Sequence, residues 1–343
     1  MTYVRMVHRV IIAFSLLAMA GGLIGTVTAQ GQDRHVLSLE VDGIITPVVE
    51  RFIERAIERG EERDAELVLI HLDTPGGLLS STRKIVEHLL NAEVPTAVYV
   101  SPRGAFAASA GTFITAAANF AVMAPGTNIG AASPVGSGGE ELGETIKDKV
   151  TNDAAALMRS IADERGRNSD TLEETVLEAT SYSAQEAVEL NMVDFIADDL
   201  DDLLTQLHGR EAVTPAGVVV LNTRDVEIEG FDMSLVERFL QFLSDPNISF
   251  LLLSLGGLGI FVELLNPGLI VPGLVGIILL VLAFVTFGNL PVNWAGVVLI
   301  LLAVALATLE YYVAGFGVLG VGAIICFVLG SLLLFFHTGA PSP

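Results

Sequence analysis

The stretch ELVLIHLDTPGG, residues 66–77, decides the fold class of this chain. Its first seven residues are mostly apolar, as expected of a strand that is buried on both faces of a parallel sheet. The motif DTPGG then forms a tight turn, and residues 78–91 have the apolar periodicity of a helix. A strand, a tight turn and a helix form the repeating unit of α/β proteins, so we predict an α/β domain built on right-handed crossovers.

The same alternation continues on both sides of this stretch. We expect one domain over residues 33–245, which is long enough for a single core. The segment PVGSGGEELGE, residues 134–144, interrupts the pattern, and its four glycines predict a mobile loop. Strands are predicted at residues 35–41, 66–72, 96–100 and 120–123. Helices are predicted at residues 47–59, 78–91, 109–118, 150–164, 172–179 and 184–190. A further helix begins at the acidic run 198–202, and an amphipathic helix is predicted at 233–245.

The average composition hides two unlike parts. The 343 residues contain 18 Lys and Arg against 40 Asp and Glu, a formal net charge of −22, but residues 247–343 contain no Lys or Arg and only two acids, Glu263 and Glu310. A wholly soluble enzyme would not carry so long an apolar segment, and the phosphates of a nucleic acid would repel so acidic a chain. The single cysteine, Cys326, leaves no intrachain disulfide framework and no cysteine-based zinc site.

The first residues predict export. Arg5 and Arg9 precede an uncharged apolar run at residues 10–24, and the small residues that follow predict a signal peptide, residues 1–29, cleaved after Ala29. The alternative is an uncleaved anchor helix. In either case the two arginines stay in the cytoplasm, so we expect the domain that follows to be extracytoplasmic.

The tail predicts a transmembrane region of about four helices over residues 247–337, and hence a multi-pass protein of the cell membrane. Each apolar stretch is long enough to cross a bilayer, and glycines would let the helices pack closely. Glu263 is a functional candidate because it is ionisable in an apolar span, but its place just before Asn266-Pro267 favours a structural role in capping backbone. The stretches are residues 248–265, 269–288, 295–312 and 316–336.

Two short motifs can build an acyl-transfer site. In DTPGG, Gly76 and Gly77 leave backbone N–H groups uncovered that can face an oxyanion, although an ordinary strand–helix turn has the same sequence. In AASAGT, residues 107–112, Ser109 lies between small residues at the start of a helix, although serine is also a common N-cap. Because the two motifs follow neighbouring strands of one sheet, a nucleophile and a glycine turn would meet there.

DTPGG followed by AASAGT resembles the pattern of the ClpP/crotonase-like serine peptidases. With MAPGTNIGAA (residues 123–132), KVTN (149–152), RGRN (165–168) and the tail motif ELLNPG (263–268), the chain is similar to the NfeD family of membrane-bound peptidases. The resemblance implies a ClpP/crotonase-like domain followed by an all-α transmembrane bundle, with Lys149 as the base of a Ser-Lys dyad and stomatin-like (SPFH) substrates or partners. Long members of that family end in a small β-barrel (OB-fold) domain, which we expect to be lacking here or supplied by another chain.

The residues themselves leave the identity of the base open. The stretch IGAASPV, where ClpP-type enzymes carry their histidine, contains none, although His71 or His88 could still serve. A lysine base must be neutral, so its pKa has to fall from about 10.4 to about 7–8, and only desolvation can achieve this beside Glu144, Asp148 and Asp153. We read Lys84 and Lys147 as solvated charges, and expect the glycine-rich residues 136–143 to bring Lys149 to Ser109 when substrate binds.

We therefore predict a membrane-anchored serine endopeptidase. Ser109 would attack the peptide, Lys149 would take its proton, and the amides of Gly76 or Gly77 and of Ala110 would form the oxyanion hole. We expect no metal or cofactor, apolar segments of membrane-associated proteins as substrates, a role in membrane-protein quality control, and a homo-oligomer, dimer or larger. Two other classes stay open: a crotonase-like acyl-CoA enzyme, which export argues against, and a non-catalytic scaffold for a stomatin-like partner, which the presence of both Ser109 and Lys149 argues against.

Overall fold

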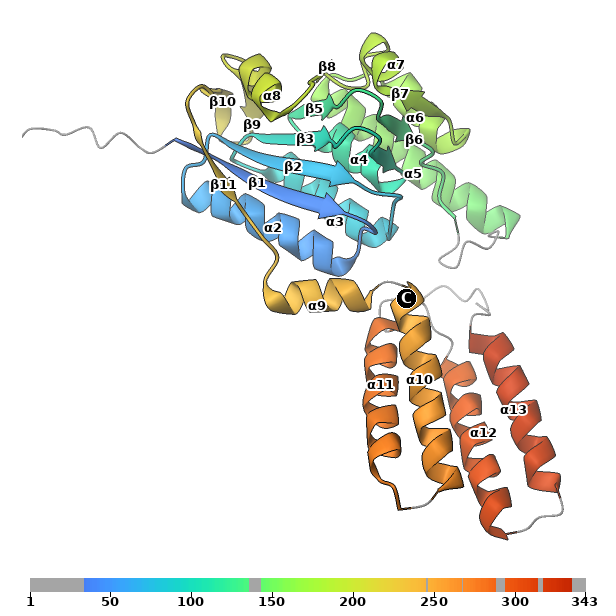
Figure 1. Ribbon diagram of the computed structural model, residues 1–343. Coiled ribbons are helices and arrows are strands. Elements are labelled where there is room, and N and C mark those ends of the chain that lie inside the picture. Colours follow the sequence, from blue (N-terminus) through green and yellow to red (C-terminus); the bar gives the residue numbers. More distant parts are fainter. Residues whose placement is uncertain are drawn as a thin grey trace, which may run out of the picture. The chain divides into compact units, whose positions relative to one another are not determined.

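A six-stranded, wholly parallel sheet forms the centre of the α/β domain (Figure 1). The computed structural model describes residues 34–135, 143–244, 246–266, 268–287, 294–313 and 317–334. The strand order in the sheet is β11-β1-β2-β3-β5-β8. The strands are β1 (His35–Asp42), β2 (Leu67–Asp73), β3 (Thr96–Val100), β5 (Phe120–Met123), β8 (Phe195–Ile196) and β11 (Glu227–Gly230). The α/β part of the predicted fold class is confirmed.

Both faces of this sheet are buried, as the apolar run at its centre predicts. Val68, Ile70 and Leu72 of β2 pack in the larger core with helices α2 (Pro47–Glu62), α3 (Leu79–Asn91) and α4 (Ala110–Ala117). Leu67 and Leu69 point to the other face and pack in a second core with α8 (Leu200–Leu207). Alternate residues of one strand thus serve two cores, which is why β2 needs apolar residues almost throughout.

A second, three-stranded sheet lies beside the first and was not predicted. It consists of β4 (Phe106–Ala108), β6 (Asn128–Gly130) and β7 (Ser181–Ser183), with β4 parallel and β7 antiparallel to β6. Its first strand ends at the residue before Ser109, so this small sheet determines where the candidate nucleophile stands. The hairpin of β9 (Glu211–Thr214) and β10 (Gly217–Val220) was also not predicted.

Helix α5 (Glu144–Arg165) begins six residues earlier than residue 150, where the sequence pattern placed its start. Lys149 therefore lies in the second turn of a helix and does not open one, which corrects the expected position. Most of the glycine-rich loop, residues 136–142, lies outside the described residues. After α5 follow α6 (Ser169–Leu177) and α7 (Ala184–Glu189), close to their predicted positions.

Helix α9 (Leu235–Leu243) confirms the predicted amphipathic segment and is held against α2 by polar side chains. The Arg55 guanidinium donates to both oxygens of Glu237, at 3.0 and 2.6 Å, and the Thr46 hydroxyl donates to Gln241 Oε1 at 2.8 Å. The opposite face of α9 is apolar and open to solvent, with four exposed side chains: Leu235, Val236, Phe239 and Phe242.

The described part of the tail forms two helical hairpins. Helix α10 (Pro246–Leu265) packs against α11 (Val271–Phe287), and α12 (Trp294–Val313) packs against α13 (Val318–Leu334). Glycines bring the first pair close, since a Cβ on Gly276 would lie 2.7 Å from the carbonyl oxygen of Gly256. Among the described residues, no helix is long and apolar enough to cross a membrane. The four predicted spans are therefore not confirmed and stay a prediction, while the predicted signal peptide lies outside the described residues.

The two acids of the tail hold the hairpins together in the same way. The Glu263 carboxylate accepts the N–H groups of Gly268 at 3.3 Å and Gly273 at 3.4 Å, where α11 begins. Glu310 accepts those of Gly317 at 2.6 Å, Leu319 at 2.9 Å and Gly320 at 3.2 Å, where α13 begins. Each acid therefore caps the unpaired N–H groups of the next helix, and the structural interpretation of Glu263 is confirmed.

Candidate active site

Ser109 stands on a strained turn between β4 and α4. Its backbone has φ +50° and ψ −110°, a region that residues with a side chain rarely adopt. Two bonds hold it there: the Ser109 N–H donates to the Gly130 carbonyl at 3.0 Å, and the Thr112 N–H donates to the Ser109 carbonyl at 3.0 Å. Such strain costs about 1–3 kcal/mol and persists where the surroundings over-determine the geometry. A serine on a sharp strand-to-helix turn is also how α/β hydrolases present their nucleophile.

Gly76 of the DTPGG turn lies directly against this serine. A Cβ on Gly76 would stand 2.8 Å from Ser109 Cβ and 3.2 Å from Ser109 Oγ, and Gly76 has φ +123°. Only glycine therefore fits at this position, both for space and for backbone conformation. The structure brings the glycine turn and the serine together, as their places after neighbouring strands predicted.

The three amides proposed for the oxyanion hole differ in their hydrogen bonds. The Gly76 N–H donates to Thr74 Oγ1 at 3.0 Å, so it is engaged inside its own turn. Within the described residues, the N–H groups of Gly77 and Ala110 donate no hydrogen bond. Ala110 is the first residue of α4, where a helix leaves its N–H groups without an internal acceptor. Among the described residues, the Gly77 and Ala110 amides are thus the two of the three without an acceptor, and their role in an oxyanion hole stays a prediction.

Neither candidate lysine contacts Ser109 in the described structure. Lys149 and Lys147 are both exposed on the first turns of α5, and within the described residues neither side chain makes a hydrogen bond or ion pair. The dyad is thus not assembled here, and the role of Lys149 stays a prediction. Lys84 was read as a solvated charge and is exposed, but it also forms an ion pair with Glu50 at 3.6 Å.

The two histidines considered as alternative bases, His71 and His88, contact other residues. His71 Nδ1 lies 3.0 Å from Ser101 Oγ, and burial lowers the pKa of His71 although the charge of Glu40 acts to raise it. His88 lies next to two carboxylates, those of Glu50 and Glu54. Within the described residues no histidine contacts Ser109, so the geometry gives no support to a Ser-His mechanism.

A cavity of about 750 Å³ lies at the carboxyl ends of β1, β2 and β3, beside the start of α8. It is strongly acidic, and Ser109 does not line it. Asp73 connects the two places, because it lines the cavity while its Oδ1 accepts the Phe106 N–H of β4 at 3.1 Å. Burial, together with the charges of Asp199 and Asp198, raises the pKa of the Tyr99 phenol in this cavity. The lining side chains with charge or hydrogen-bonding groups are Glu40, Asp42, His71, Asp73, Tyr99, Ser101, Arg103, Asp198 and Asp199.

Two arginines of the RGRN motif hold the far end of α4, the helix that follows Ser109. Arg167 donates to the carbonyls of Ala116 at 3.1 Å and Ala118 at 3.2 Å, and Arg165 donates to that of Ala117 at 2.7 Å. The Arg167 side chain is only 3% exposed, and Asp194 balances its charge at 3.0 Å. These guanidinium groups satisfy the last carbonyls of α4, a positioning role that the sequence pattern did not reveal.

Comparisons with known proteins cover both parts of the chain. The model of the NfeD1b N-terminal domain matches residues 35–215, and that of the NfeD integral membrane domain matches residues 247–342. The membrane-bound protease PH1510 of Pyrococcus horikoshii is 36% identical over 276 residues, which cover 79% of this chain but 62% of that protein. The membrane protein NfeD1b of Bacillus subtilis is 28% identical over 314 residues, which cover 87% of this chain and 67% of that protein.

Solved structures agree with the sequence matches on the α/β part. A lysine-to-alanine mutant of the 1510-N membrane-bound stomatin-specific protease, in complex with a substrate peptide, is 32% identical and has a TM-score of 0.58. It covers 62% of this chain, and 99% of that structure is matched. The 1510-N membrane protease specific for a stomatin homolog from Pyrococcus horikoshii is 31% identical with the same coverage and a TM-score of 0.54. With matching family models on both its α/β part and its helical tail, the chain belongs to the NfeD family of membrane proteins.

Proposed function

We propose that this chain is a membrane-anchored serine endopeptidase with Ser109 as nucleophile and Lys149 as general base. One observation carries the proposal: Ser109 is held at φ +50° against Gly76, with the N–H groups of Gly77 and Ala110 free of other acceptors among the described residues. A serine, a glycine turn and two free amides are the parts that acyl transfer needs. The similarity to 1510-N proteases supports the reaction, and one of those structures carries a lysine mutation and another a serine mutation.

In the proposed reaction Ser109 Oγ attacks the carbonyl carbon of the scissile peptide, and its proton passes to neutral Lys149 Nζ. The tetrahedral oxyanion receives hydrogen bonds from the N–H groups of Gly77 and Ala110. When the intermediate collapses, the C–N bond breaks and Lys149 returns the proton to the leaving amine. Water then attacks the acyl-enzyme by the same route and releases Ser109.

Lys149 has to be buried before it can act in this way. Its side chain is exposed in the structure, and Asp148, the residue before it on α5, is exposed as well. Asp153, one turn further on, is paired with Arg83. We propose that a bound apolar substrate covers Lys149 and supplies the desolvation, so the enzyme is active only on segments that fill the site.

The proposed substrate class rests on the need to bury Lys149 and on the similarity to the 1510-N protease. We propose apolar segments of stomatin-like membrane proteins as substrates, since the similar 1510-N protease is specific for a stomatin homolog. We further propose a homo-oligomer, a role in membrane-protein quality control, and a multi-pass anchor that places the α/β domain outside the cytoplasm. The exposed apolar side chains of α9, directly before the membrane domain, support a position of this helix at the membrane surface.

The test uses the full chain, purified in detergent. It is incubated with a library of apolar peptides, and the products are identified by mass spectrometry beside those of Ser109→Ala. We expect internal cleavage by the natural sequence, none by Ser109→Ala, and labelling of Ser109 by a fluorophosphonate probe. Equal cleavage by a folded Ser109→Ala chain would remove Ser109 from the mechanism. Failure of both cleavage and labelling, with a stomatin-like protein still bound, would favour the scaffold alternative.

A further inference from the structure

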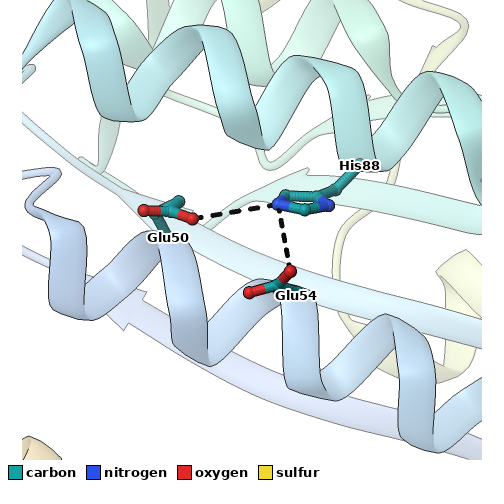
Figure 2. A group of neighbouring side chains, drawn as sticks. All are labelled: Glu50, Glu54 and His88. Carbon is teal, nitrogen blue, oxygen red and sulfur yellow. Dashed lines mark ion pairs between the residues drawn. The ribbon is translucent and has the colours of Figure 1, made fainter.

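Two carboxylates and one imidazole converge between α2 and α3 (Figure 2). Glu50 and Glu54 stand one turn apart on α2, and His88 comes from α3. His88 Nε2 lies 3.8 Å from Glu50 Oε1 and 3.7 Å from Glu54 Oε1, and one ligand atom from each of the three residues lies within 4.8 Å of the other two. None of the three residues belongs to the Ser109 site, so the cluster needs an explanation of its own.

Glu50 is the unusual member of this cluster. Its side chain is only 7% exposed, and within the described residues its carboxylate accepts no hydrogen bond. The nearest positive group is Lys84 Nζ at 3.6 Å, beyond hydrogen-bond range, and the Lys84 side chain is 62% exposed. A buried carboxylate normally accepts hydrogen bonds or binds a cation, and an exposed lysine offsets little of its desolvation. Glu50 thus presents a nearly buried carboxylate to His88 and Glu54, and only an exposed ammonium group offsets its charge.

We propose that Glu50, Glu54 and His88 bind one divalent transition-metal ion of the Zn²⁺ type. Oxygen and nitrogen ligands stand about 2.0–2.2 Å from Zn²⁺, so two ligands of one tetrahedral ion are about 3.3–3.6 Å apart. The measured separations of 3.7 and 3.8 Å are only slightly wider, so a shift of a few tenths of an ångström, on the order of side-chain adjustment, brings the three groups to an ion. Glu54 and His88 are half-buried, so water can complete a four-ligand shell.

The donor set indicates which ions bind. An imidazole beside two carboxylates suits Zn²⁺ and related transition ions, whereas Mg²⁺ and Ca²⁺ take oxygen ligands. The ion links α2 to α3, the two helices that follow β1 and β2, and α3 begins two residues after Gly77. Binding therefore stiffens the framework that carries the glycine turn, and supplies no group to the Ser109 reaction.

The experiment uses the full chain in detergent, purified with an affinity tag that contains no histidine. After EDTA treatment and desalting, the chain is titrated with ZnCl₂ by calorimetry, and its thermal unfolding is followed with and without the metal. We expect one Zn²⁺ per chain, and an unfolding midpoint raised by about 5 °C when free Zn²⁺ is about 100 times Kd. MgCl₂ and CaCl₂ should give no such rise.

Four variants decide whether the cluster is the site. Glu54→Gln and His88→Gln should each weaken Zn²⁺ binding by more than about 100-fold. Loss of a residue that only supports a metal ligand costs about 10- to 100-fold, and loss of a ligand itself should cost more. Glu58→Gln, on an exposed side chain of the same helix, should leave it unchanged. Lys84→Gln should tighten it, because a competing ammonium is removed. The proposal is overturned if the natural sequence binds no Zn²⁺, if Glu54→Gln and His88→Gln keep full affinity, or if Lys84→Gln weakens binding.

Discussion

Gly76→Ala tests whether the close approach of the glycine turn to Ser109 matters for activity. The new Cβ would stand 2.8 Å from Ser109 Cβ, so the two carbons must separate by about 0.6 Å to reach ordinary contact at 3.4 Å. Overpacking of this kind costs about 1–3 kcal/mol, and alanine at φ +123° adds backbone strain of similar size. We expect a loss of about 2–6 kcal/mol in the free energy of unfolding.

Activity should fall by more than stability alone explains. A nucleophile misplaced by 1 Å can lose about 100-fold in rate, and the shift here is about 0.6 Å, so kcat/KM per folded molecule should drop by about 10- to 100-fold. Gly104→Ala is the matched control, because Gly104 also has a positive φ, +90°, but nothing lies within 4 Å of its Cβ position. This variant should lose about 1–2 kcal/mol of stability from backbone strain and keep most of its activity.

The measurements are urea unfolding, followed by far-ultraviolet circular dichroism, and cleavage of an apolar peptide by the full chain in detergent. Labelling by a fluorophosphonate probe gives a second readout of Ser109 that does not need a peptide. If folded Gly76→Ala cleaves peptide within about threefold of the natural rate, the contact between the two motifs has no catalytic meaning. The same conclusion follows if Gly104→Ala is inactivated to the same degree.

Four further predictions follow from the same geometry. Ser109→Gly should be inactive but more stable than Ser109→Ala by about 1 kcal/mol in urea unfolding, because glycine relieves the strain at φ +50°. Lys149→Arg should abolish peptide cleavage, because arginine stays protonated, while Lys147→Arg should keep it. Arg167→Leu should cost about 3–5 kcal/mol of stability, because it breaks a buried ion pair and uncaps α4. Burial acts to raise the pKa of Glu237, but hydrogen bonds from Ser234 and Arg55 outweigh it and lower the pKa below 4.5. The ionised carboxylate therefore stabilises the fold above pH 4.5, and this stabilisation is lost in stronger acid. Hydrogen exchange of the α9 amides should become faster in that acid range, and Glu237→Gln should not show this pH-dependent change.

The central strands could be predicted because their environment determines their composition. A strand buried on both faces of a parallel sheet must be apolar at nearly every position, and the predicted strands at residues 66–72, 96–100 and 120–123 agree with β2, β3 and β5 to within one residue. The meeting of Gly76 with Ser109 could be predicted for a related reason. Both motifs follow neighbouring parallel strands, and the carboxyl ends of such strands share one edge of the sheet.

The remaining features depend on contacts between residues far apart in sequence. The strands β4, β6 and β7 have three residues each, too few for any periodicity, and they form by pairing between distant segments, as Ile129 does with Ala107 and Tyr182. The sequence also did not show that the Gly76 N–H is engaged inside its own turn, since only the structure brings it to the Thr74 hydroxyl. The cluster at His88 was missed likewise, because His88 is more than thirty residues from its two carboxylates in the chain.

The two halves of the proposed dyad are prepared to different degrees. Ser109 is fixed before any substrate arrives, by the Gly130 carbonyl at one end of α4 and by two arginine side chains at the other. Lys149 is exposed and, among the described residues, without a hydrogen bond or ion pair. If Lys149 is the base, as we propose, Ser109 alone cannot attack a polar peptide, since no base beside it removes its hydroxyl proton. Selectivity then lies in the lysine, because only a substrate apolar enough to desolvate Lys149 completes the catalytic pair.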